Sequence, residues 1–172
     1  LDGQGKYFDS KFKQSGKPWN ETQVIKGYVT DVITDKAIDW LKKCDSSKPF
    51  CLMIHHKAPH GPYRHPERYN NIFTDKALPM PEKFHSEYSD RGSALAQSRG
   101  RFSKLDHVYS GHFDRKVPKG LEKGTRQYKE WAYQNIFNGY RRLVASLDDN
   151  IGRLLDYVDK SGLSDNTLVV YT

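Results

Sequence analysis

Two short apolar runs separated by a long amphipathic stretch constrain the fold of this chain most. The runs cover residues 50–56 and 167–172, and each is too short for a helix and rich in residues that favour strands. Between them, residues 127–160 carry apolar side chains at alternating three- and four-residue steps, which predicts one long helix. Strand, helix and strand in this order predict parallel pairing with a right-handed crossover. The carboxyl ends of both strands would then lie at one edge of the sheet.

A second amphipathic helix is predicted before the first of these strands. Apolar residues recur at helical steps from Glu21 to Cys44, and Pro49 and the residue before it disfavour any continuation. Residues 57–125 are predicted to be mostly loop, with short helices near 66–70 and 91–98. A loop this long indicates a functional segment, an insertion packed over the sheet, or partial disorder. The predicted class is α/β, with parallel central strands covered by helices and a long loop-rich insertion.

The first predicted strand ends in a cluster of histidines and a lysine. His55 and His56 point to opposite faces of a strand, so both can face one ligand only if the strand has already bent. Pro59 imposes a turn that projects His60 beyond the sheet edge, where open α/β sheets bind ligands. Lys57 supplies charge and histidine supplies hydrogen bonds, which suits a tetrahedral oxyanion. Two alternatives stay open: histidines that cap loop backbone groups, and a metal site, which is disfavoured because Pro59 prevents helical ligand spacing.

The charge balance favours anionic partners. The formal net charge is +7, which suits nucleic acid, acidic glycans, or phosphate and sulfate esters. The basic stretch 112–120, with Arg99 and Arg101 upstream, has two interpretations: it binds phosphate or sulfated sugar, or it is solvated surface. No apolar run approaches the roughly 20 residues that cross a bilayer, so no membrane span is predicted.

Two further groups of residues are interpreted as structural. Cys44 and Cys51 are expected to be half-buried thiols, with a disulfide between them as an unsupported alternative. The cluster 148–150 lies within the long helix near Arg153, where ion pairing is ordinary. The sequence contains no G-x-S-x-G elbow, phosphate-binding loop or dinucleotide fingerprint.

Three stretches resemble the sulfatase family of the alkaline-phosphatase-like superfamily. Residues 27–41 resemble the family helix "Y-x-T-D-x-x-T-D-x-A-I-x-F", and residues 48–60 resemble its strand ending in "A-P-H-x-P". Residues 140–172 are similar to its long helix and following strand. The resemblance implies that residues 1–172 are an internal segment of a single sulfatase catalytic domain with a partial sulfatase fold. Residues 61–125 would be its loop-rich, substrate-side insertion.

The resemblance also implies an activity and a site. The family hydrolyses sulfate esters with calcium and with a formylglycine made from Cys or Ser in C/S-x-P-x-R. His60 matches the histidine that contacts the substrate sulfate, and Lys57 and His56 beside it are expected to line the pocket. The sequence contains no C/S-x-P-x-R motif. The nucleophile and the calcium ligands are therefore expected outside this segment, the latter directly after Thr172, and the segment alone is expected to be inactive.

The expected partner is a sulfated carbohydrate or another sulfate ester, and not nucleic acid. Two alternatives remain: a phosphoesterase or phosphonate hydrolase of the same superfamily, and a non-catalytic basic module that binds glycan or nucleic acid. A periplasmic, secreted or lysosomal location follows from the family alone. The sequence leaves the oligomeric state open.

Overall fold

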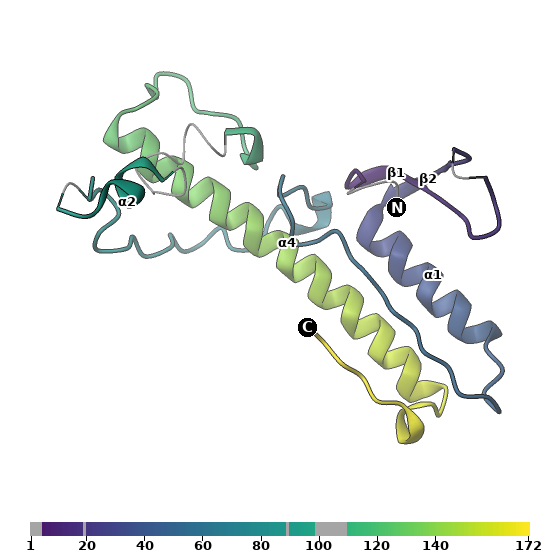
Figure 1. The fold of residues 1–172 in the computed structure, drawn as a ribbon. Coiled ribbons are helices and arrows are strands. Elements are labelled where there is room, and N and C mark those ends of the chain that lie inside the picture. Colours follow the sequence, from purple (N-terminus) through teal and green to yellow (C-terminus); the bar gives the residue numbers. More distant parts are fainter. Residues whose placement is uncertain (1–4, 19, 89, 99–109) are drawn as a thin grey trace. The chain divides into compact units, whose positions relative to one another are not determined.

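The computed structural model describes residues 5–18, 20–88, 90–98 and 110–172 (Figure 1). Its elements, in chain order, are β1 (Phe8–Phe12), β2 (Gln23–Tyr28), α1 (Val29–Lys43), the 3-10 turn η1 (Glu67–Tyr69), α2 (Ser93–Gln97), the 3-10 turn η3 (Ser110–His112), α4 (Arg126–Lys160) and the 3-10 turn η4 (Ser164–Asn166). The chain divides into two compact units, one made of Leu1–Pro59 with Val144–Thr172 and the other of His60–Leu143. Helix α4 contributes residues to both units.

The first unit opens with an antiparallel hairpin, whose second strand takes up the first residues of the helix predicted from Glu21 to Cys44. Strands β1 and β2 pair with Ser10 opposite Ile25, and α1 begins only at Val29. The predicted start at Glu21 is therefore wrong. Gly27 explains the difference, because its φ of 110° is incompatible with a right-handed helix and readily adopted by glycine. The helical period across 21–28 was a coincidence of spacing.

Side chains of α1 and its N-terminal flank bond to the C-terminal half of α4 within this unit. The Tyr28 hydroxyl lies 3.0 Å from the Ser146 hydroxyl, and the Asn150 amide donates to Asp31 over 2.8 Å. Arg153 pairs with Asp35 and also donates to Asn150. Asn150 is only 1% exposed, and its hydrogen bond to Asp31 links α4 to α1. The structural interpretation of 148–150 is confirmed for this residue.

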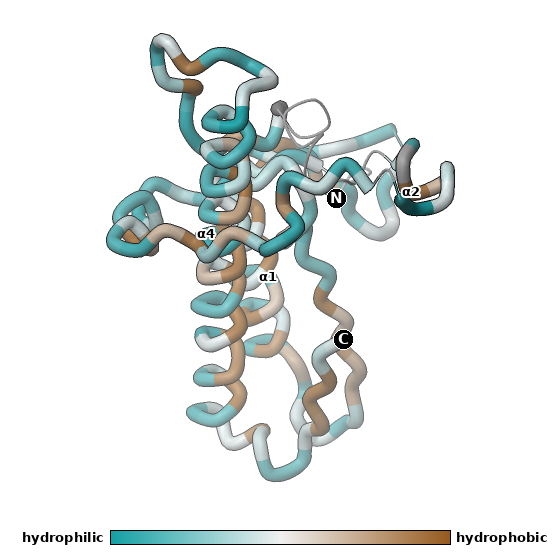
Figure 2. Tube along the Cα trace, turned by 90° about the vertical axis from the view of Figure 1, so that its left-hand side faces the viewer, coloured by the Kyte–Doolittle hydropathy of each residue, from teal (hydrophilic) through white to brown (hydrophobic). Residues whose placement is uncertain are grey.

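The two apolar runs predicted as strands take part in no ladder. Within the described residues, the sheet consists of β1 and β2 alone. Met53 is 75% exposed and Leu168 is 88% exposed, and Figure 2 shows the apolar stretch that precedes the C-terminal end. A strand requires a hydrogen-bonded neighbour, and no described segment supplies one for 50–56 or 167–172. The helices predicted to cover a parallel sheet are formed, but the described residues do not form that sheet.

The second unit is built around the N-terminal half of α4. Phe84, Tyr133 and Ile136 form its buried cluster, against which side chains from three loops pack. The predicted short helices are confirmed as η1 and α2, and most of the remaining described residues up to 125 are loop, as expected. The Gln134 amide both accepts from the Leu78 N–H and donates to the Leu78 carbonyl, each over 2.8 Å. Side chains of α4 therefore satisfy loop backbone groups that secondary structure would otherwise pair.

The structure also bears on the predictions made for the two cysteines and for a membrane span. Cys44 is half-buried, as expected, but Cys51 is exposed, and neither forms a disulfide. No helix among the described residues combines the length and the apolar content that a bilayer span requires.

Candidate functional site

The predicted site residues are distributed over both units. His56 and Lys57 belong to the first unit, and His60 is the first residue of the second. His56 is half-buried, and burial lowers the pKa of its imidazole, so the ring is neutral at pH 7. Its Nδ1 atom is buried and has no hydrogen-bond partner among the described residues. A buried polar atom without a partner is costly, and it is a natural contact for a bound group.

Lys57 lies against an aromatic face. Its Nζ is 5.0 Å from the centroid of the Tyr7 ring, which is buried. This is the geometry of a cation–π contact. Partial burial lowers the pKa of the ammonium group. The ring thus holds the Lys57 ammonium group in a defined position.

His60 is exposed at the start of the second unit. Its Nδ1 lies 2.7 Å from the Gly61 carbonyl oxygen. A carbonyl oxygen only accepts, so Nδ1 must carry the hydrogen. This contact fixes the tautomer and orientation of the ring, as is common for histidines that act through their other nitrogen.

A second histidine, not singled out by the sequence, lies beside His60. The ring of His112 packs so closely on Gly61 that a Cβ on that residue would come within 2.5 Å of Cε1. Its centroid is 5.4 Å from the Tyr63 ring in an edge-on arrangement. Burial lowers the pKa of His112, and the nearby charges of His60 and Arg64 lower it further. The unit therefore juxtaposes two imidazoles from segments about 50 residues apart.

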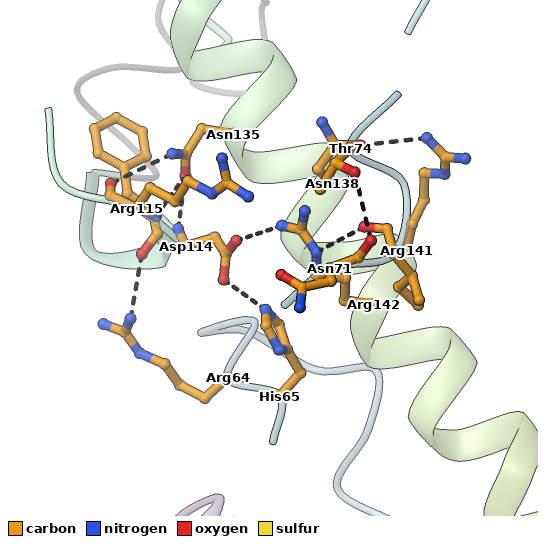
Figure 3. A network of polar contacts seen from close by, with 12 residues as sticks. Arg64, His65, Asn71, Thr74, Asp114, Arg115, Asn135, Asn138, Arg141 and Arg142 are labelled. Carbon is orange, nitrogen blue, oxygen red and sulfur yellow. Dashed lines mark hydrogen bonds and ion pairs between the residues drawn. The ribbon is translucent and has the colours of Figure 1, made fainter. Parts of the chain in front are cut away.

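A buried carboxylate anchors the segment that carries His112. Asp114 Oδ1 lies 2.6 Å from His65 Nε2, and Asp114 Oδ2 accepts from Arg142 Nη1 over 2.6 Å (Figure 3). The three side chains are 12%, 4% and 3% exposed respectively. Burial alone would raise the pKa of Asp114. The His65 hydrogen bond and the charges of His65, Arg142 and Arg115 outweigh burial and lower that pKa. Asp114 is accordingly ionised at neutral pH.

Further hydrogen bonds hold the same segment to α4 and to the loop after His60. The Asn135 amide oxygen accepts from the backbone N–H groups of Asp114 and Arg115, over 2.6 and 3.3 Å. The Arg64 guanidinium donates to the Phe113 carbonyl over 3.2 Å. Segments 60–65 and 112–115 are thus fixed to one another and to the helix.

The basic stretch 112–120 has two different parts. His112 to Asp114 are half-buried and bonded, whereas 115–120 is exposed, as expected of solvated surface. Arg99 and Arg101 lie outside the described residues. Sequence reasoning missed the His65–Asp114–Arg142 group, because its members are far apart in the chain and share no motif.

The arrangement in the second unit suits a ligand that has an anionic group and further hydrogen-bonding groups. His60 and His112 offer hydrogen-bonding ring nitrogens and Arg64 offers positive charge, all on neighbouring segments. Among the described residues, no three His, Cys, Asp or Glu side chains gather in a way that could hold a metal ion.

Comparisons with known proteins identify the family. The Sulfatase family model matches residues 3–172. An N-acetylglucosamine-6-O-sulfatase of Bacteroides thetaiotaomicron is 33% identical over 208 residues, which cover 98% of this chain and 36% of that protein. The multifunctional alkaline phosphatase superfamily protein PehA of Trinickia caryophylli is 29% identical, over 81% of this chain and 25% of its own length.

A solved structure agrees with the sequence matches. It is the structure of BT4656 in complex with its substrate D-glucosamine-2-N,6-O-disulfate, and it aligns with a TM-score of 0.70 and 30% identity over 95% of this chain and 40% of that one. The described helices and loops are therefore part of an α/β sulfatase fold, as predicted. The chain spans between 25% and 40% of the length of these relatives. It belongs to the sulfatase family of the alkaline-phosphatase-like superfamily.

Proposed function

We propose that the protein carrying this chain hydrolyses sulfate esters of carbohydrates. The observation that carries the proposal is the 33% identity to an N-acetylglucosamine-6-O-sulfatase across 98% of the chain. The similarity to a structure that holds a disulfated glucosamine supports the same substrate class. In the reaction, water supplies the oxygen that bonds to sulfur, the ester S–O bond breaks, and the released alcohol takes up a proton.

Within this chain, we assign the sulfate contact to His60. The Gly61 carbonyl engages Nδ1, so Nε2 is the nitrogen that we propose meets the sulfate. Because Nδ1 already carries a hydrogen, Nε2 carries one only in the imidazolium form, which can donate a hydrogen bond to a sulfate oxygen or a proton to the leaving alcohol oxygen. We propose Lys57 and His56 of the first unit as further substrate-binding residues, one through the charge held over Tyr7 and the other through its buried Nδ1.

Sulfatases in general use calcium and a formylglycine. The described residues offer no cluster of metal ligands, and the sequence has no C/S-x-P-x-R motif. The described residues therefore do not fit calcium, the sequence has no position for the formylglycine, and we assign no step of the reaction to either group. We retain the expectation that the isolated segment is inactive, together with a periplasmic, secreted or lysosomal location that rests on the family alone.

The test is turnover of N-acetylglucosamine-6-sulfate by the full protein that carries this chain. Changing His60→Ala should reduce kcat at least about 100-fold, in the range that general acid–base groups contribute. Its thermal midpoint should stay close to that of the unchanged protein because the ring is exposed. The matched control is His85→Ala, which removes a half-exposed histidine of the same unit that pairs with Glu130. A large stability loss with normal turnover would make His60 structural instead.

A phosphoester substrate is the second candidate. The 29% identity to PehA, a multifunctional member of the alkaline phosphatase superfamily, is the observation that favours it. Parallel assays with 4-nitrophenyl sulfate and 4-nitrophenyl phosphate compare the two reactions on one leaving group. A higher kcat/KM on the phosphate would replace the sulfatase proposal with this one.

A further inference from the structure

The second unit holds a ring that the reaction proposed above does not use. His112 lies beside His60, and its ring packs on the backbone of Gly61, directly after the proposed sulfate contact. The contact with Gly61 leaves no room for any side chain at that position. The His112 ring therefore packs directly against the backbone that follows His60.

The segment that carries His112 is unusually well fixed for a loop. Two residues after it, Asp114 receives bonds from His65 and Arg142, and its N–H bonds to Asn135. Burying three charged or polar side chains is costly unless each is paired, as these are. Preorganised groups of this kind are typical of positions where a side chain must meet a ligand with defined geometry.

We propose that His112 is a second substrate-contacting imidazole, which binds a hydroxyl of the sugar while His60 contacts the sulfate. The inference rests on the proposed function, since it assigns the part of the substrate that each histidine contacts. His112 is a specificity-determining residue in this scheme.

The chemistry of the ring distinguishes the two parts of the substrate. Burial and the neighbouring charges of His60 and Arg64 keep His112 neutral, with one donor and one acceptor nitrogen. Sulfate oxygens only accept hydrogen bonds, so the acceptor nitrogen would be left unused against sulfate. A sugar hydroxyl both donates and accepts, and it can therefore satisfy either nitrogen. Arg64, which stays charged, is suited to the anionic part.

The experiment measures KM and kcat of the full protein on two sulfate esters. One is N-acetylglucosamine-6-sulfate and the other is 4-nitrocatechol sulfate, which has no sugar. The variant His112→Phe keeps a ring against Gly61 and Tyr63 but removes both nitrogens. It should raise KM for the sugar ester about 3- to 10-fold, the effect of losing one hydrogen bond, with kcat and the KM of the aryl ester nearly unchanged. His85→Phe is the control and should alter neither KM.

Two conservative substitutions of His112 provide a second test of the inference. Asn places its amide near the position of Nδ1, and Gln reaches that of Nε2, so one of His112→Asn and His112→Gln should restore the low KM while the other does not. These two variants decide the question if His112→Phe fails to fold. Normal sugar KM in every folded variant would overturn the inference, as would an equal rise of KM on both esters. If the unchanged protein hydrolyses neither ester, the proposed function itself has failed.

Discussion

Removing the carboxylate of Asp114 should destabilise this protein more than any other single change at its acidic residues in the second unit. Asp114 is the partner of a guanidinium that is almost fully buried: Arg142 is 3% exposed, and its Nη1 lies 2.6 Å from Asp114 Oδ2. Arg142 also donates from Nε to the Ile72 carbonyl over 3.2 Å. The substitution Asp114→Ala therefore leaves a positive charge inside the unit without its counter-ion.

The expected cost follows from what happens to that charge. Breaking a buried ion pair by removing one partner costs about 3–5 kcal/mol, because the remaining ion loses its compensation and does not regain water. The bond from His65 Nε2 is lost as well. For an m value of about 2 kcal/mol/M, the urea midpoint should fall by about 1.5–2.5 M.

The assay is urea unfolding of the full protein, followed by fluorescence, with Asp75→Ala as the matched control. Asp75 is exposed, lies in the same unit and has no ion pair among the described residues. Its loss should change the free energy of unfolding by no more than about 0.5 kcal/mol. The difference between the two variants isolates burial and pairing from the mere loss of a negative charge.

A double variant tests the mechanism and not only the size of the effect. If the cost arises from an uncompensated Arg142, then Asp114→Ala with Arg142→Met should be more stable than Asp114→Ala alone. A double variant as unstable as the sum of its single changes would refute the reasoning. A cost below about 1 kcal/mol for Asp114→Ala would refute it too, since the pair would then contribute no more than a surface one.

Three further predictions follow from single contacts. Folding lowers the pKa of Asp114, so its carboxylate stabilises the fold fully above the unfolded pKa of about 4. This stabilisation is lost as the pH falls through the lower folded pKa. The urea midpoint of the unchanged protein should therefore approach that of Asp114→Asn below about pH 4. Gly61→Ala should raise KM for the sugar ester by displacing the His112 ring, which would be 2.5 Å from the new Cβ, whereas Gly111→Ala, with open space around it, should not. Tyr28→Phe should cost about 0.5–1.5 kcal/mol in urea unfolding, since it removes a buried 3.0 Å hydrogen bond to Ser146.

The helices were predictable because burial of one face leaves a period in the sequence. Helix α4 runs from Arg126 to Lys160, within one residue of the stretch that the apolar steps indicated. The same argument failed at 21–28, where the steps are also helical but Gly27 adopts a φ of 110°. A period describes which side chains share a face, and it carries no information on whether each backbone position can be helical.

The strand predictions failed for a different reason. Apolar content marks 50–56 and 167–172 as suited to burial in a sheet, but a strand is defined by hydrogen bonds to another segment. Within the described residues, neither run has such a neighbour. Composition can therefore identify a candidate strand, whereas the existence of the ladder depends on residues elsewhere.

Electrostatics explains why the sequence indicated one histidine of the proposed site, His60, and not the other, His112. His60 follows a predicted strand end and a proline, so local rules placed it at a functional edge. His112 lies in a run of basic residues that local rules assign to solvent. The exception in that run is Asp114, an acid among cations, which neutralises Arg142 on α4 and thereby draws the segment inward. A single opposite charge in a basic loop is thus a signal of long-range pairing, but its partners, His65 and Arg142, become evident only once the chain has folded.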